Sequence, residues 1–137
     1  MKIPKITTFL MFNGDAEAAI RRYTDLFEDS EILTMVKYDD TIPEQAGKVQ
    51  HSIFTLNGQV FMAIDNMNGV GIEMNPAMSL YVTVKDQFEM DKLYHGLKQN
   101  GAILMSKTEM LPQFREFAWV QDKYGVNFQL ALPESKK

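Results

Sequence analysis

The hydrophobic and polar positions of the first half predict one helix among four strands. An apolar run at 8–12 indicates a buried strand, and apolar residues at helical spacing over 16–27 indicate one face of a helix. Strand-like runs follow at 32–38, 49–56 and 59–64, with a loop at 39–48. Asn57 and Gly58, between the last two runs, predict a type I′ hairpin turn. The predicted order is β-α-β-β-β.

The same order begins again after a linker at 65–76 that is rich in Asn and Gly. A strand is expected at 78–84. The apolar face of a second helix consists of Met90, Leu93, Tyr94 and Leu97. Strands are then expected at 102–107, 116–121 and 126–132, with a loop at 108–114 and a four-residue turn at 122–125.

Equivalent positions recur at a nearly constant spacing, which supports an internal repeat. Asp15 and Asp86, each placed to cap a helix, are 71 positions apart, and so are Tyr23 and Tyr94. Coincidence between two amphipathic helices is the alternative. Gly101 is expected to end the second helix at the C′ position.

Composition narrows the class of protein. The length of 137 residues suits one domain, residues 1–137, with modules at about 1–68 and 76–133. The net charge of −4 argues against nucleic acid binding, and no apolar segment approaches the ~20 residues of a membrane span. The absence of cysteine excludes disulfides and thiolate chemistry. Because the start of the chain lacks the apolar core of a signal peptide, we expect a cytoplasmic protein.

Four segments of the chain carry a family resemblance. They read FLMFNGDAEAAI at 9–20, VQHS at 49–52, NGQVFMAID at 57–65 and WVQDKYGVNFQ at 119–129. Together they resemble PhnB-like proteins of the vicinal oxygen chelate superfamily, which also includes glyoxalase I, extradiol dioxygenases and bleomycin-resistance proteins. The resemblance implies an α+β fold in which two βαβββ modules form an open, cup-shaped mixed sheet with the helices outside. It also implies a homodimer.

Some relatives carry the description demethylubiquinone methyltransferase. The sequence does not support it, because no strand is followed by a glycine-rich loop and a helix that could cradle a nucleotide-like cofactor. No cofactor is therefore assigned.

Strand alternation sorts the side chains of the second module into two faces. The apolar set, expected under the helix, is Leu80, Val82, Val84, Phe128, Leu130 and Leu132. The opposite set is polar and comprises Ser79, Tyr81, Thr83, Asn127, Gln129 and Ala131. Polar groups on central strands need water or a ligand, since burying them unpaired costs roughly 1–3 kcal/mol each. This face is therefore predicted to line a ligand-binding cup.

The first module follows from the repeat, which equates Thr8 with Ser79. The side chains expected under its helix are Phe9, Met11, Phe61 and Ala63. Those expected to face the cup are Thr8, Leu10, Phe12, Val60, Met62 and Ile64. Hairpin pairing adds His51, opposite Ile64, and Glu116, opposite Ala131, to the cup. It sends Trp119 into the core beside Phe128.

A glyoxalase-type metal site is not matched. In metal-dependent relatives the ligands lie on the first and last strands of each module. The equivalent positions of this chain are occupied by Thr8, Met62, Ser79 and Gln129. Two hydroxyls, a thioether and an amide do not form the usual set of imidazole and carboxylate ligands. We assign no metal ligand, although a divalent ion remains possible.

His51 and Glu116 are the candidate catalytic residues, as general acid or base. Each has a structural alternative: His51 as a strand residue bonded to a neighbour, and Glu116 as a surface residue paired with Arg115. The candidate ligand pocket consists of Thr8, Leu10, Met62, Ser79, Tyr81, Asn127 and Gln129.

Two functions remain open at this point. The first is binding of a small organic ligand in the cup without metal chemistry. The alternative is a metal-dependent lyase, isomerase or dioxygenase of the same superfamily. Whether the protein is an enzyme, and which ligand it binds, do not follow from the sequence.

Overall fold

The computed structural model describes residues 2–108 and 114–134, so the predicted loop around Pro112 lies mostly outside the described residues. Two compact units divide the chain, Met1–Ile72 and Glu73–Lys137. The first contains β1 (Thr8–Phe12), α1 (Ala16–Leu26), β2 (Glu31–Lys37), β3 (Val49–Leu56) and β4 (Gln59–Asp65). The second contains β5 (Leu80–Thr83), α2 (Gln87–Lys98), β6 (Ala102–Thr108), β7 (Phe114–Gln121) and β8 (Asn127–Pro133). The doubled β-α-β-β-β order is confirmed.

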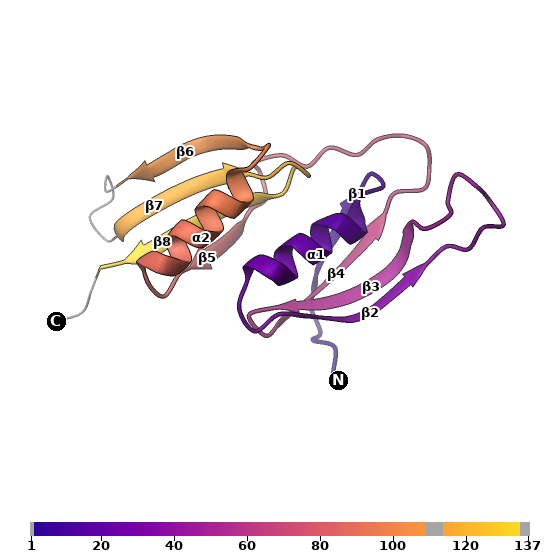
Figure 1. The fold of residues 1–137 in the computed structure, drawn as a ribbon, viewed down its shortest axis with the longest axis horizontal. Coiled ribbons are helices and arrows are strands. Elements are labelled where there is room, and N and C mark those ends of the chain that lie inside the picture. The colour runs from indigo at the N-terminus through magenta and orange to yellow at the C-terminus, as the bar shows by residue number, and fades with distance from the viewer. Residues whose placement is uncertain (1, 109–113, 135–137) are drawn as a thin grey trace. The chain divides into compact units, whose positions relative to one another are not determined.

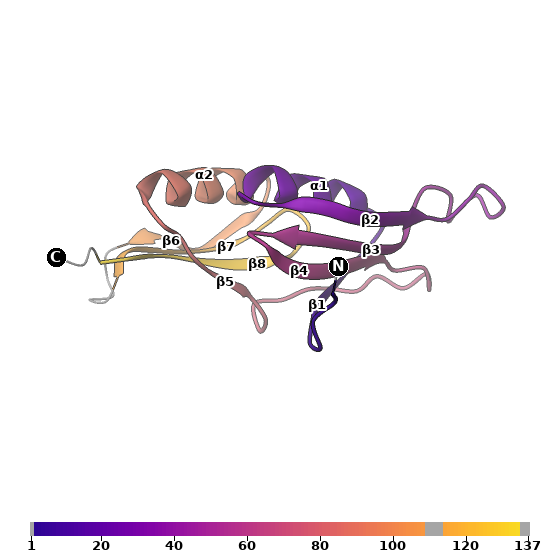
Figure 2. The same ribbon diagram turned by 90° about the horizontal axis from the view of Figure 1, so that it is seen from below.

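Each unit contains one four-stranded mixed sheet. The strand orders are β1-β4-β3-β2 and β5-β8-β7-β6. In both, the first strand runs parallel to the last strand of its unit, and the other neighbours are antiparallel (Figure 1). Figure 2 shows each helix over one face of its own sheet. The opposite face of each sheet is called the helix-free face below.

The helix side of each sheet holds the core. In the first unit Ile20 and Tyr23 of α1 and Phe54 of β3 are buried where the helix packs on that strand. In the second, Leu93 of α2 and Phe128 of β8 are buried on the helix side. Each such large side chain contributes about 1.5–3 kcal/mol when fully buried. The apolar positions that predicted the two helices therefore supply their cores.

The N-terminus of α1 is capped in an unexpected way. Asp15 occupies the N-cap position, but its side chain makes no capping hydrogen bond. Instead Oδ1 of Asp65, at the end of β4, accepts from the backbone N–H groups of Gly14 and Ala16, both at 2.9 Å. Its Oδ2 accepts from the N–H of Val49 at 2.9 Å. One buried carboxylate thus joins the helix start to two strands.

The ends of α2 confirm one prediction and correct another. Asp86 caps the helix as predicted, with Oδ1 accepting from the N–H of Glu89 at 2.9 Å. Glu89 in turn accepts from the N–H of Lys85 at 2.8 Å, one residue before the cap. At the other end the left-handed residue is Asn100, with φ of 59°, and not Gly101. A glycine is needed at position 101 for a different reason, because a Cβ there would overlap the backbone oxygen of Gln121.

The first hairpin has the predicted register. Asn57 and Gly58 have φ values of 51° and 80°, as a type I′ turn requires. Ile53 pairs with Met62 and Thr55 with Val60. The two-residue turn therefore placed both of these pairs correctly, whereas the pairing predicted for His51 with Ile64 lies outside the observed ladder.

The second hairpin is shifted by one residue from the prediction. Its loop contains five residues, 122–126, because Gln121 pairs with Asn127. Asp122 stabilises this loop: its Oδ1 accepts from the N–H groups of Tyr124 and Val126, both at 2.9 Å. Pairing Val126 with Gln121 was therefore wrong. As a result Glu116 pairs with Leu132 on the helix side, and Trp119 pairs with Gln129 on the helix-free face.

Strand β1 also faces the opposite way from the prediction. Thr8 pairs with Phe61 and Leu10 with Ala63, so both lie on the helix side. Phe9 pairs with Met62 on the helix-free face, where it is 51% exposed. The cause is the segment before α1. Thr8 and Leu80 hold equivalent positions, opposite Phe61 and Phe128, but α1 begins eight residues after Thr8 and α2 only seven after Leu80. The offset between the repeats is consequently 72 in the first strand and 71 in the helix.

Between β4 and β5 the chain has no regular element, as the predicted linker requires. Among the described residues, neither helix is long and apolar enough to cross a membrane.

Candidate functional site

A row of four side chains crosses the helix-free face of the second unit. Tyr81 of β5 pairs with Gln129 of β8, Gln129 with Trp119 of β7, and Trp119 with Met105 of β6. Because paired residues share a face, these side chains are lateral neighbours. Tyr81 is 53% exposed and Met105 37% exposed. The row combines two aromatic rings, a thioether and one amide.

The amide of Gln129 is oriented by Ser79. Its Nε2 donates to the hydroxyl oxygen of Ser79 at 2.7 Å. No donor among the described residues bonds to Oε1 of Gln129, and this oxygen is not buried away from solvent. The serine therefore holds an amide whose carbonyl oxygen is available as an acceptor. Ser79 and Gln129 share a face, as predicted, and they are also in direct contact.

Asn127 braces the tryptophan of this face. Its Oδ1 accepts from Nε1 of Trp119 at 3.2 Å, and its Nδ2 donates to Gln121 Oε1 at 3.3 Å and to the Gly125 carbonyl at 3.2 Å. The side chain is 1% exposed. Asn127 was predicted to contact ligand, but its polar atoms are already bonded. It positions the indole instead.

Aromatic packing extends the row. The ring of Tyr81 lies 6.4 Å from that of Phe117, centroid to centroid, and Phe117 lies 5.7 Å from Phe114. Phe117 shares the helix-free face because it pairs with Ala131. The face therefore presents a fixed aromatic surface next to the Gln129 amide.

The helix-free face of the first unit is mostly apolar. Phe9, Met62 and Ile53 are lateral neighbours on it. His51 shares this face, as predicted, and its exposed side chain lies opposite Val36. The described residues provide no hydrogen-bond partner that would orient its imidazole, so the acid–base role of His51 stays a prediction.

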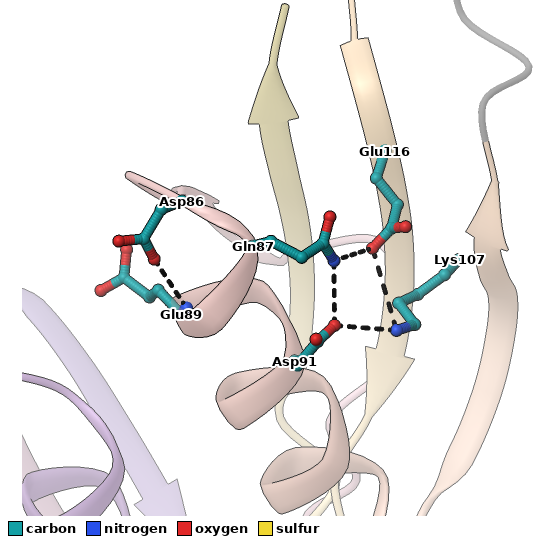
Figure 3. Close-up of polar contacts among 6 residues, drawn as sticks. All are labelled: Asp86, Gln87, Glu89, Asp91, Lys107 and Glu116. Atoms are coloured by element: carbon teal, nitrogen blue, oxygen red, sulfur yellow. Dashed lines mark hydrogen bonds and ion pairs between the residues drawn. The ribbon is translucent and has the colours of Figure 1, made fainter.

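Glu116 is on the helix side and belongs to a polar cluster with α2. Its Oε1 accepts from Gln87 Nε2 at 3.0 Å and lies 3.9 Å from Lys107 Nζ (Figure 3). Placing it in the cup was wrong, because the hairpin register is shifted. Its structural alternative was also incomplete: the partners found are Gln87 and Lys107, whereas Arg115 was expected.

The same cluster ties Asp91 to Lys107. Oδ1 of Asp91 accepts from Lys107 Nζ and from Gln87 Nε2, each at 2.9 Å. The hydrogen bond from Lys107, followed by that from Gln87, lowers the pKa of Asp91 below its ordinary value. The same bond raises the pKa of Lys107. This arrangement stabilises charges and offers no free base.

The four positions that the family resemblance equates with metal ligands do not fit a divalent ion here. Met62 lies beside Phe9, and Thr8 is on the other face of the sheet. Ser79 and Gln129 contribute a neutral hydroxyl and a neutral amide. Within residues 2–108 and 114–134, no group of three or more His, Asp or Glu side chains is placed to hold a metal. We therefore derive no chemical step through a metal.

A nucleotide-like cofactor does not fit the helix N-termini either. Such cofactors use free backbone N–H groups at the start of a helix. At α1 these groups bind the carboxylate of Asp65, and at α2 Asp86 accepts from the first turn. A phosphate or carboxylate would have to displace a carboxylate that is already present.

Trp119 and Phe117 are the site residues that sequence reasoning missed. Trp119 was misplaced by counting four residues in the second hairpin turn, and Phe117 was not assigned to a face. Asp122 was the available signal, because an aspartate that bonds the N–H groups two and four residues on closes a longer loop.

The chain is similar to known proteins over almost its whole length. A family model described as 3-demethylubiquinone-9 3-methyltransferase matches residues 4–131. The PhnB protein of Bacillus cereus is 50% identical over 94% of this chain and 99% of its own, with a TM-score of 0.89. No curated protein is significantly similar to the chain.

Two more distant structures share the fold alone. A glyoxylase/bleomycin resistance protein/dioxygenase domain from Frankia sp. EAN1pec is 17% identical, over 99% of this chain and 96% of that one, with a TM-score of 0.66. The fosfomycin resistance protein FosX of Listeria monocytogenes is 6% identical, over 98% and 96%, with a TM-score of 0.61.

Proposed function

This chain belongs to the PhnB-like (3-demethylubiquinone-9 3-methyltransferase) family of the glyoxalase/bleomycin resistance superfamily, and on that premise we propose that it binds a small organic ligand. The binding surface is the helix-free face of the second unit. Methyl transfer is not part of the proposal, because both helix N-termini are capped by carboxylates of the chain itself.

The observation that carries the proposal is the oriented amide of Gln129. Ser79 holds its nitrogen at 2.7 Å, which leaves the carbonyl oxygen without a donor among the described residues. An amide held in one orientation distinguishes a ligand donor from a ligand acceptor.

The neighbours of Gln129 indicate the shape of the ligand. Tyr81 and Trp119 lie on either side of the amide across the sheet. Aromatic side chains favour flat apolar partners, with ring centroids about 4.5–7 Å apart. A planar ligand that donates one hydrogen bond to Gln129 Oε1 matches this surface.

The positions of the two candidate acid–base residues favour binding over catalysis at this face. Glu116 is bonded to Gln87 on the other side of the sheet, and His51 belongs to the first unit. Neither lies beside the amide of Gln129 in the second unit's sheet. We therefore propose no proton transfer at this site.

A thermal-shift screen of small aromatic metabolites tests the proposal. A ligand at 100 times its Kd adds about 2.7 kcal/mol to the free energy of unfolding. Gln129→Leu removes the acceptor of one oriented hydrogen bond, so the affinity for the ligand should fall at least about tenfold and the stabilisation should shrink with it. Glu116→Gln, changed on the opposite face of the same sheet, is the matched control and should keep the affinity.

The opposite pattern would contradict the proposal. If Glu116→Gln abolished binding and Gln129→Leu did not, the ligand would lie on the helix side. Metal analysis of protein purified without an affinity tag tests the alternative. Stoichiometric Zn, Ni, Mn or Fe that is lost in Gln129→Ala would favour a metal-dependent enzyme.

We also propose that the protein is a homodimer, on the strength of the family resemblance. Light scattering at micromolar concentration should give twice the mass of one chain. A monomer at that concentration would exclude a stable dimer.

A further inference from the structure

The dipeptide Asn-Gly occurs four times in the chain, beginning at Asn13, Asn57, Asn68 and Asn100. Asparagine before glycine is chemically labile, because the glycine nitrogen can attack the asparagine side chain without hindrance from a Cβ. The local sequence alone makes the four sites nearly equivalent. The fold makes them different.

We propose that Asn68 is the site at which the folded protein deamidates. The backbone nitrogen of Gly69 loses its proton and bonds to Cγ of Asn68, and the Cγ–Nδ2 bond breaks with release of ammonia. Solvent water then opens the cyclic imide at either carbonyl. One amide and one water are consumed, and one ammonia and one aspartyl or isoaspartyl residue are formed, without any oxidant or reductant.

The attacking nitrogen is engaged at the other three sites. The N–H of Gly14 donates to Asp65 Oδ1 at 2.9 Å. The N–H of Gly58 donates to the carbonyl of Asp29 at 2.9 Å, and that of Gly101 to the carbonyl of Lys98 at 2.9 Å. Each bond holds the proton that must leave, and it directs the nitrogen away from the side chain of the preceding asparagine.

Two of these sites are restrained further. Both polar atoms of the Asn13 side chain are bound to Ile72: Nδ2 donates to its carbonyl at 2.7 Å, and Oδ1 accepts from its N–H at 2.9 Å. Gly101 lies too close to the backbone of Gln121 to admit a Cβ. Ring closure at Asn13 would have to break the hydrogen bonds with Ile72, and ring closure at Asn100 would have to move the backbone at Gly101.

Asn68 has the geometry that the reaction needs. It is exposed, and so is Gly69, whose N–H has no hydrogen-bond acceptor among the described residues. The N–H of Val70 donates to Oδ1 of Asn68 at 3.4 Å. This contact turns the side chain toward the backbone that follows it, which includes the Gly69 nitrogen. It also places a donor on the oxygen that becomes negative during attack, which stabilises that charge.

The product would change the segment that joins the two units. The reaction adds one negative charge at residue 68, between β4 and β5. An isoaspartyl product also lengthens the backbone by one carbon. Because the segment has no regular structure, neither unit has to unfold for the reaction to occur.

Peptide mapping by mass spectrometry tests the proposal on the full chain. The protein is incubated folded in mildly alkaline buffer and digested with trypsin at several times. Asn57 and Asn68 fall in the same tryptic peptide, 49–85, so fragment ions assign the site. Conversion at Asn68 should be roughly tenfold faster than at the other three, the factor that one backbone hydrogen bond represents.

The same incubation in guanidinium chloride is the matched control. In the unfolded chain the four sites should convert at similar rates, because the protecting hydrogen bonds are gone. The proposal is overturned if Asn13, Asn57 or Asn100 converts as fast as Asn68 in the folded protein. It is also overturned if Asn68 leads by the same margin after unfolding, since sequence and not structure would then set the rate.

Discussion

Among single residues, Asp65 has a large structural role that the sequence pattern does not predict. Its carboxylate accepts three backbone hydrogen bonds, from Gly14, Ala16 and Val49, and the residue is 3% exposed. Asp15, which looks like the cap, makes no capping bond with its side chain. Removing this buried carboxylate leaves all three N–H donors without an acceptor.

Asp65→Ala should therefore lower the free energy of unfolding by about 2–4 kcal/mol, the range for loss of a buried hydrogen-bond network. Asp15→Ala is the matched control and should cost at most about 0.5 kcal/mol. Denaturant unfolding followed by circular dichroism measures both. Equal losses in the two variants would show that Asp15 is the effective cap.

The sequence predicted the order of elements well, because each depends on a local pattern. Asn57-Gly58 set its hairpin register, and Asp86 capped α2 as expected. The predicted face of a side chain was wrong wherever a turn had one residue more than the pattern suggested. The extra residue before α1 moved Thr8 and Leu10 off the predicted face, and the five-residue loop exchanged Glu116 for Trp119.

These errors have one physical origin. Side chains in a strand alternate with a period of two, so a turn that is one residue longer reverses every side chain beyond it. Hydrophobic pattern does not encode turn length, which depends on contacts such as those of Asp122 with Tyr124 and Val126. The shared face of Ser79 and Gln129 was predictable because the faces of β5 and β8 were assigned from the alternation within each strand and not from the length of a turn.

At the scale of elements, the polar cluster links α2 to the two strands beyond β8. Gln87 and Asp91 lie on the helix, Lys107 on β6 and Glu116 on β7. The ion pair between Asp91 and Lys107 is partly exposed, so its contribution to stability is modest. Its signature is a dependence of stability on pH.

Because the pKa of Asp91 is lowered in the folded protein, its contribution is present above the ordinary value of about 4 and is lost as pH falls through the lowered value. Lys107→Met should raise the pKa of Asp91 toward its ordinary value and weaken the loss of stability in that acid range. Carboxyl NMR titration and unfolding at several pH values measure the two effects. Lys92→Met, an exposed lysine of the same helix, should leave both unchanged.

At the scale of the whole molecule, each unit has its own sheet, helix and core. The division falls between Ile72 and Glu73, in the segment without regular structure. In the first unit Phe12, Tyr23 and Phe54 are buried, and in the second Leu93, Phe128 and Leu130. No element is shared between the two units.

The fragment 1–72, expressed alone, should therefore fold with the helix and strand content of the first unit. Circular dichroism and amide hydrogen exchange measure this. The amide of Tyr23, in α1, should be among the most protected of the fragment. The same fragment carrying Asp65→Ala should lose this protection. A random-coil spectrum for the unmodified fragment would mean that its fold depends on residues beyond 72.

The unequal turns before the two helices have a practical consequence for protein engineers. A binding motif transplanted between the halves must be shifted by 72 in the first strand and by 67 in the last. A copy of the Ser79–Gln129 pair in the first half therefore belongs at Thr7 and Met62. A designer who used the helix spacing of 71 would install the serine at Thr8, on the wrong side of the sheet from its intended glutamine.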